Sequence, residues 1–240
     1  MGKKLSKKST DKQKLQQLLS DKKLIILDID DTLIKSCHAI IQHHLDTAKK
    51  MNLRVPTKKE ILHLISNPWT KIIVTVWPEM NDKKKIAEFK KVYRSFPKRL
   101  PITVISGTIT AIKKLRKKYL LAIITGRDEY SLRKLLPELG IELSQFTVIC
   151  HSDDRVTKPD PKVFEFALRK INQTLKNNNL KARKDMLTKK DAVYIGDSLI
   201  DANCANNAKV DFIAVLTGHF KRRDFRKFKA AIIKSVKELT

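Results

Sequence analysis

Short runs of apolar residues that stop abruptly at acidic, threonine or glycine residues constrain this fold more than any other feature of the chain. The runs are Leu24–Leu27, 120–124, 192–195, 212–216 and, more weakly, 146–150. Such short, wholly apolar runs are typical of strands that are buried on both faces of a parallel sheet. Helical patterns, for example at 128–139 and 162–175, alternate with them. The alternation predicts an α/β fold built on a doubly wound parallel sheet.

A mostly helical domain is predicted within this fold, inserted after the first strand. Its amphipathic helical patterns lie at 37–50, 58–65, 69–77 and 82–95, and prolines punctuate them. We therefore assign residues 36–100 to an inserted helical domain and residues 21–35 and 101–240 to the α/β core. Residues 1–20 are predicted to be a basic, flexible N-terminal segment, and residues 225–239 a terminal amphipathic helix packed on the core.

The net charge is +26, from 51 lysine and arginine residues against 25 acids. Lysine supplies most of these cations, and the excess is spread along the whole chain. Nucleic-acid-binding proteins usually concentrate their basic residues on one face or in one tail. We therefore favour a generally basic surface, and a nucleic-acid partner is considered but not favoured.

Composition excludes several classes of protein. A 42% hydrophobic content is enough to form a core, so the chain is not wholly disordered. No run approaches the roughly 18 apolar residues of a membrane-spanning helix. Cys37, Cys150 and Cys204 are too few and too far apart for a disulfide framework, which favours a reducing, cytoplasmic location. Met1 to Ser6 fits a short, common N-acylation pattern, but acylation is not expected.

Four aspartates follow two of the predicted strands. Asp28 and Asp30 come after the first apolar run, and Asp197 and Asp201 come after the run at 192–195. Ligands of open α/β sheets bind beyond the carboxyl ends of the strands, where these acids are expected to meet. Helix N-capping would explain one or two of them but not all four. Clustered carboxylates repel one another unless a cation neutralises them, and Mg²⁺ prefers such oxygen ligands.

A phosphate site is predicted at the same edge of the sheet. Thr125-Gly126 offers a hydroxyl and an accessible backbone N–H after another strand. Lys158 precedes Pro159 in an extended segment and supplies a cation that balances both the phosphate and the acids. Together these groups would stabilise charge on a transferring phosphoryl group.

The ordered set of motifs resembles the haloacid dehalogenase (HAD) superfamily of phosphohydrolases, in particular its phosphoglycolate phosphatase-like branch. The four family motifs stand here, in order, as LIILDIDDTLI (24–34), LAIITG (121–126), Lys158-Pro159 and Gly196-Asp197 to Asp201. Each motif alone is weak, whereas the ordered set is specific. The resemblance covers about residues 22–240 and implies a Rossmann-like core with a helical C1-type cap.

The resemblance also implies a role for each matching residue. Asp28 would be the nucleophile that forms an aspartyl-phosphate, and Asp30 the general acid and base. Mg²⁺ would be bound by Asp28, the backbone carbonyl of Asp30, and Asp197. Asp201 would support these ligands without binding the metal directly. Thr125 and Gly126 would bind the phosphoryl oxygens, and Lys158 would orient the nucleophile and the phosphate.

A helical cap over the site implies that the substrate is a small phosphorylated metabolite. Two other functions stay open: a phosphatase that acts on nucleotides or polynucleotide ends, and a non-catalytic protein that binds anions or nucleic acid on a HAD fold. Arg127, which follows the second motif, departs from the asparagine frequent in the phosphoglycolate branch. It would either contact the substrate or pair on the surface.

Overall fold

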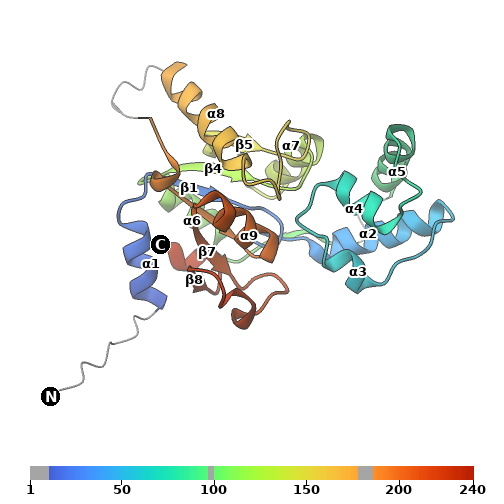
Figure 1. Ribbon diagram of the computed structural model, residues 1–240, viewed down its shortest axis with the longest axis horizontal. Coiled ribbons are helices and arrows are strands. Elements are labelled where there is room, and N and C mark those ends of the chain that lie inside the picture. The colour runs from blue at the N-terminus through green and yellow to red at the C-terminus, as the bar shows by residue number, and fades with distance from the viewer. Residues whose placement is uncertain (1–10, 97–99, 178–185) are drawn as a thin grey trace.

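A computed structural model describes residues 11–96, 100–177 and 186–240 of the chain (Figure 1). Its centre is a six-stranded sheet in the order β5-β4-β1-β6-β7-β8, in which all neighbours are parallel. The strands are β1 (Leu24–Leu27), β4 (Leu120–Ile124), β5 (Val148–Cys150), β6 (Ala192–Gly196), β7 (Asp211–Val215) and β8 (Ala230–Ile233). The predicted doubly wound α/β sheet is confirmed.

Helices cover both faces of this sheet. Side chains alternate along β1, so that Ile25 and Leu27 enter one apolar cluster while Leu24 and Ile26 enter the other. The first cluster also contains residues of α1 (Asp11–Leu19), α6 (Thr108–Leu115) and α7 (Glu129–Glu138). The second contains residues of α8 (Val163–Asn177) and α9 (Leu199–Ala208). Burial on both faces is why the strand sequences are apolar throughout rather than alternating.

The inserted helical segment has a small core of its own, in which Trp77 and Phe89 are fully buried. Its helices are α2 (Cys37–Lys50), α3 (Lys58–Leu62), α4 (Trp69–Val76) and α5 (Lys83–Ser95). They lie together at one end of the molecule, beyond the end of the sheet (Figure 1).

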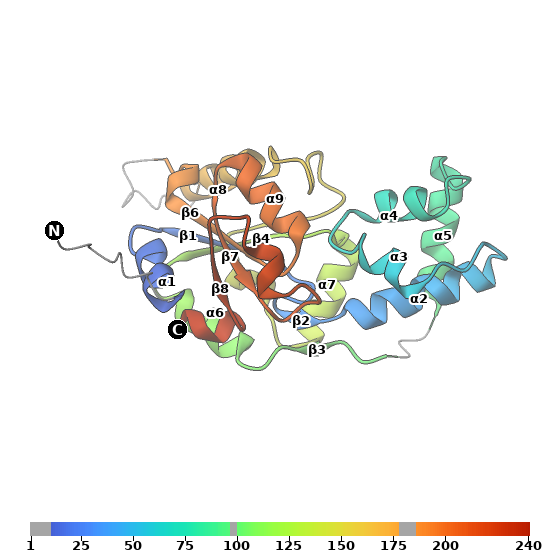
Figure 2. The same cartoon turned by 60° about the horizontal axis from the view of Figure 1, so that its bottom comes forward.

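The chain enters and leaves this helical segment through two paired linkers. These are β2 (Ile34–Lys35) and β3 (Thr103–Val104), which form a short antiparallel ladder (Figure 2). They lie just outside the predicted cap, residues 36–100, whose limits and cap function stay predictions.

Two predictions near the chain ends are wrong. Residues 11–19 are not a loose segment but helix α1, which buries Leu15 and Leu19 against the core. Residues 225–239 do not form a terminal helix. They contain strand β8 beside β7, flanked by the 3₁₀ turns η3 (Arg222–Phe225) and η4 (Val236–Leu239). Two further 3₁₀ turns, η1 (Leu143–Gln145) and η2 (Lys189–Asp191), precede β5 and β6.

Residues 1–10, which carry the acylation pattern, lie outside the described part of the chain. Within the described ranges, no helix combines the length and the apolarity needed to cross a bilayer. Cys37, Cys150 and Cys204 are buried free thiols.

Candidate active site

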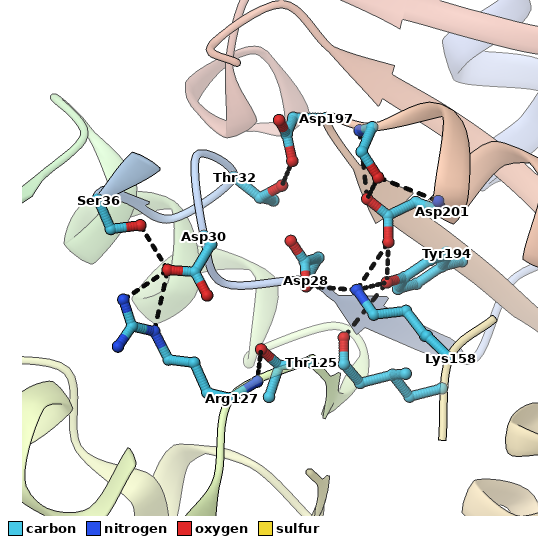
Figure 3. A network of polar contacts seen from close by, with 12 residues as sticks. Asp28, Asp30, Thr32, Ser36, Thr125, Arg127, Lys158, Tyr194, Asp197 and Asp201 are labelled. Carbon is cyan, nitrogen blue, oxygen red and sulfur yellow. Dashed lines mark hydrogen bonds and ion pairs between the residues drawn. The ribbon is translucent and has the colours of Figure 1, made fainter. Parts of the chain in front are cut away.

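Three central strands carry the candidate site at their carboxyl ends. Strand β1 lies between β4 and β6, so Asp28, Thr125 and Asp197 follow neighbouring strands and meet beyond the sheet edge. All three side chains are buried. Figure 3 shows these three side chains together with Lys158, which joins Asp28 to Asp201.

Lys158 joins two of the aspartates. Its ammonium donates to Oδ1 of Asp28 and to Oδ1 of Asp201, each at 2.7 Å, and its side chain is fully buried. It also donates to the hydroxyl of Tyr194 at 3.1 Å. Burial alone would lower the pKa of Lys158, but the carboxylates of Asp201 and Asp28 outweigh it and raise that pKa above its usual value. Lys158 is therefore held as a buried cation.

The acidic cluster fits a divalent cation. Carboxylate oxygens of Asp28, Asp197 and Asp201 lie within 4.8 Å of one another. Oδ2 of Asp28 is buried and has no hydrogen-bond partner in the part of the chain that the structure describes. Burial, followed by the charges of Asp201 and Asp30, outweighs Lys158 and raises the pKa of Asp28 to about 8. Burial also raises the pKa of Asp197 well above its usual value, with Asp201 and Asp28 adding to the effect. Lys158 alone thus does not stabilise the ionised forms of Asp28 and Asp197 fully, and a bound cation would stabilise them.

Asp201 differs from the other two because both its oxygens are already engaged. Oδ1 accepts from Lys158 and, at 2.7 Å, from the Tyr194 hydroxyl. Oδ2 accepts from the backbone N–H of Ser198 at 3.2 Å and from its hydroxyl at 2.6 Å. These bonds orient Lys158 and the loop around Asp197, and the supporting role of Asp201 at a metal site stays a prediction.

Asp30 turns its side chain away from the cluster. Its Oδ1 accepts from the hydroxyl of Ser36 and from two nitrogens of Arg127, Nε at 2.9 Å and Nη2 at 2.6 Å (Figure 3). The Arg127 side chain is only 12% exposed, so this is not a surface ion pair. Burial lowers the pKa of Arg127, and the Asp30 carboxylate more than reverses that effect.

Thr125 and Gly126 lie where the core meets the helical segment. The Thr125 hydroxyl accepts from the backbone N–H of Arg127 at 3.2 Å. A methyl group placed on Gly126 would lie 2.9 Å from the carbonyl oxygen of Asn67 and 3.1 Å from that of Ser66. Glycine is therefore needed because the loop between α3 and α4 approaches the backbone at this point.

Sequence reasoning missed three residues that shape the site. Tyr194 and Ser36 bond to Asp201 and Asp30, and a methyl group on Gly218 would lie only 1.9 Å from Oδ2 of Asp197. Gly218 carried a usable signal, because Thr217-Gly218 ends the apolar run of β7 just as Thr125-Gly126 ends that of β4. The partners of Asp201 and Asp30 carried none.

Known proteins share both the sequence pattern and the fold. The family described as haloacid dehalogenase-like hydrolase matches residues 25–215. The phosphoglycolate phosphatase of Rhodobacter capsulatus is 24% identical over 204 residues, which is 82% of this chain and 85% of that protein.

Two crystal structures share the fold over most of their length. A putative haloacid dehalogenase-like hydrolase from Bacteroides fragilis superposes with a TM-score of 0.73 at 20% identity, covering 91% of this chain and 100% of that one. A protein from Haemophilus somnus, described as a predicted phosphoglycolate phosphatase, superposes with a TM-score of 0.70 at 18% identity, covering 91% of this chain and 96% of that one.

Taken with the parallel sheet, these matches identify a hydrolase with a Rossmann-like α/β fold. The chain belongs to the haloacid dehalogenase-like hydrolase family, as its sequence motifs predicted.

Proposed function

We propose that this protein is a Mg²⁺-dependent phosphatase that hydrolyses small organic phosphate monoesters. One observation carries the proposal: Asp28 follows β1 with one oxygen bonded to Lys158 and the other buried without a partner among the described residues. A carboxylate held in this way is oriented for attack, and its open oxygen is available for a metal or a phosphorus atom. The similarity to the phosphoglycolate phosphatase of Rhodobacter capsulatus supports a phosphate substrate.

In the first step, an oxygen of Asp28 attacks phosphorus and the bond to the leaving-group oxygen breaks. The proton that the leaving group needs comes from the carboxyl group of Asp30, so an alcohol departs and an aspartyl-phosphate remains. Thr125 and the backbone N–H of Gly126 bind the phosphoryl oxygens, and Lys158 orients the carboxylate of Asp28 towards the phosphorus atom.

In the second step, water attacks the phosphorus of the aspartyl-phosphate and gives its proton to Asp30. The phosphorus–oxygen bond to Asp28 breaks, which releases phosphate and restores both carboxyl groups. Asp28, Asp197 and the backbone carbonyl of Asp30 would hold Mg²⁺, which when bound stabilises negative charge on the phosphoryl oxygens. Asp201 acts through its bonds to Lys158 and Ser198.

The helical segment lies over this chemistry as a cap. Trp69, Tyr93 and Ile65 from this segment line a small cavity together with Asp28 and Gly126. Such a lining excludes water from the transfer step and admits a small ester more readily than a duplex. The free, buried cysteines support the cytoplasmic location that belongs to the same proposal.

Phosphate release with Mg²⁺ tests the function. The panel contains p-nitrophenyl phosphate, phosphoglycolate, other metabolite phosphates, nucleotides and 3′-phosphorylated oligonucleotides. We expect turnover of small esters that EDTA abolishes, and none by Asp28→Asn prepared in the same way. Turnover of the oligonucleotides alone would favour the polynucleotide-end alternative. Wild-type protein that binds oligonucleotides but hydrolyses nothing would favour the non-catalytic one.

A further inference from the structure

A second, larger cavity adjoins the proposed phosphate site. The cavity over Asp28 and Asp30 measures only about 50 Å³, whereas its neighbour measures about 200 Å³. The two share four wall residues: Ile40, Tyr93, Arg127 and Ser131. The larger cavity lies between α2 and α5 of the helical segment and α7 of the core.

Basic side chains line the larger cavity. Arg94, Arg127 and Lys134 contribute cations and His43 an imidazole, and among the described residues that line the cavity there is no aspartate or glutamate. The remaining wall is mainly apolar, with Ala39, Phe96, Ile102 and Leu135. An occupant that matches both properties has a carbon skeleton and an anionic end.

The cations differ in how far they are already neutralised. Arg127 is paired with Asp30, and Arg94 donates to Asp128 at 3.0 Å while its guanidinium lies 4.8 Å from the ring centre of Tyr130. Lys134 is exposed, and within the described part of the chain it forms no ion pair. Lys134 is therefore the cation most available to a ligand.

The volumes of the two cavities indicate where the substrate extends. The cavity over Asp28 and Asp30 has about a quarter of the volume of its neighbour, so the larger cavity offers more room for the part of the ester beyond the phosphoryl group. The leaving-group oxygen has to lie beside Asp30, the proposed proton donor. Asp30 is bonded to Arg127, which forms part of the wall between the two cavities. The rest of the leaving group is thus directed past Arg127 into the larger cavity.

We propose that the larger cavity holds the leaving group of the substrate, and that this group carries a second anion, a carboxylate or a phosphate, bound by Lys134 with Arg94. This inference rests on the proposed phosphatase function and narrows its substrate class. Charge-assisted hydrogen bonds of this kind are stronger than neutral ones. An anionic leaving group should therefore be preferred over a neutral one by about tenfold or more.

Matched substrates test the inference. Alkyl phosphates from ethyl to hexyl are compared with esters of equal chain length that end in a carboxylate or in a second phosphate. We expect kcat/KM for the best anionic ester to exceed that for the neutral ester of equal length about tenfold. Comparison of the carboxylate series with the phosphate series shows which of the two anions is preferred.

In Lys134→Met, the preference for the anionic ester over the neutral one should fall about tenfold. Lys113→Met removes an equal charge from the exposed face of α6 and should keep it.

The outcomes separate this inference from the phosphatase function itself. Equal kcat/KM for neutral and anionic esters, or an unchanged preference in Lys134→Met, would overturn the second-anion site while the enzyme remains a phosphatase. Absence of turnover for every ester, including p-nitrophenyl phosphate, would overturn the proposed function, and the inference with it.

Discussion

The ammonium of Lys158 lies 2.7 Å from Oδ1 of Asp28, and neither side chain has appreciable contact with solvent. Removing one partner from a buried ionic group leaves an uncompensated charge, which costs about 3–5 kcal/mol. Here Asp28 and Asp201 would both lose their cation. We predict that Lys158→Met lowers the free energy of unfolding by about 3 kcal/mol in urea titrations and eliminates phosphatase turnover.

A lysine on the surface provides the matched control. Lys189 pairs with Glu165 at the same distance, 2.7 Å, but their side chains are 33% and 60% exposed. Exposed pairs of this kind contribute about 0–1 kcal/mol, so Lys189→Met should leave both stability and turnover nearly unchanged. Equal stability of Lys158→Met and Lys189→Met would show that the buried network does not stabilise the fold.

The sequence allowed the sheet and the positions of the acids to be predicted, for a physical reason. Strands buried on both faces must be apolar throughout, so the ends of β1, β4 and β6 were visible as abrupt changes of composition. Because neighbouring parallel strands end at one edge, the residues after them had to converge. In the same way, the predicted helix at 37–50 matches the bounds of α2.

Features that depend on pairing between distant segments could not be predicted. Ala230–Ile233 fits a helical period as well as a strand, and its pairing with β7 decides the outcome. Likewise, no local pattern indicates that Arg127 reaches Asp30, which lies 97 positions earlier in the chain. Arg127 was predicted either to contact the substrate or to pair on the surface, and the structure gives it a buried carboxylate partner.

Gly218 should control metal binding through Asp197. A methyl group at position 218 would lie 1.9 Å from Oδ2 of Asp197, closer than any real contact, so the carboxylate would have to move. We predict that Gly218→Ala weakens Mg²⁺ binding at least about tenfold, as measured by calorimetry, since metal sites tolerate little displacement of a ligand. Near-ultraviolet circular dichroism checks that the variant is folded. Mg²⁺ affinity like that of the wild type in folded Gly218→Ala would exclude Asp197 as a ligand.

Arg127 should position Asp30 for proton transfer. Its Nε and Nη2 bind one oxygen of Asp30, and without them that oxygen keeps only its hydrogen bond from the Ser36 hydroxyl, so the carboxyl group is held less firmly. Proton donation matters for alkyl esters but little for p-nitrophenyl phosphate, whose leaving group departs without a proton. We predict that Arg127→Met lowers the ratio of kcat for n-butyl phosphate to kcat for p-nitrophenyl phosphate about tenfold.

Arg133 is the matched control for this measurement. It lies on α7 and pairs with Glu129 at 2.7 Å, with 69% of its side chain exposed. Arg133→Met should therefore keep the ratio of the two kcat values. A parallel loss on both substrates in Arg127→Met would indicate a general structural role in place of a role in positioning Asp30.

His44 should make the stability of the protein depend on pH. It is buried beside Trp69, Phe89 and Tyr93, and its Nε2 has no hydrogen-bond partner within the described ranges. Burial lowers its pKa from 6.5 to about 4. Between these two values the unfolded chain binds a proton at His44 that the native protein does not. Stability therefore falls as the pH drops from 6.5 towards 4, by up to about 1.4 kcal/mol per pH unit. We predict that urea titrations at pH 6.5 and about pH 5 show a loss of stability that is about 1.5 kcal/mol smaller in His44→Leu than in the wild type. The exposed His63, changed to leucine, should keep the wild-type pH dependence, and equal pH dependence in all three proteins would rule out His44 as the titrating group.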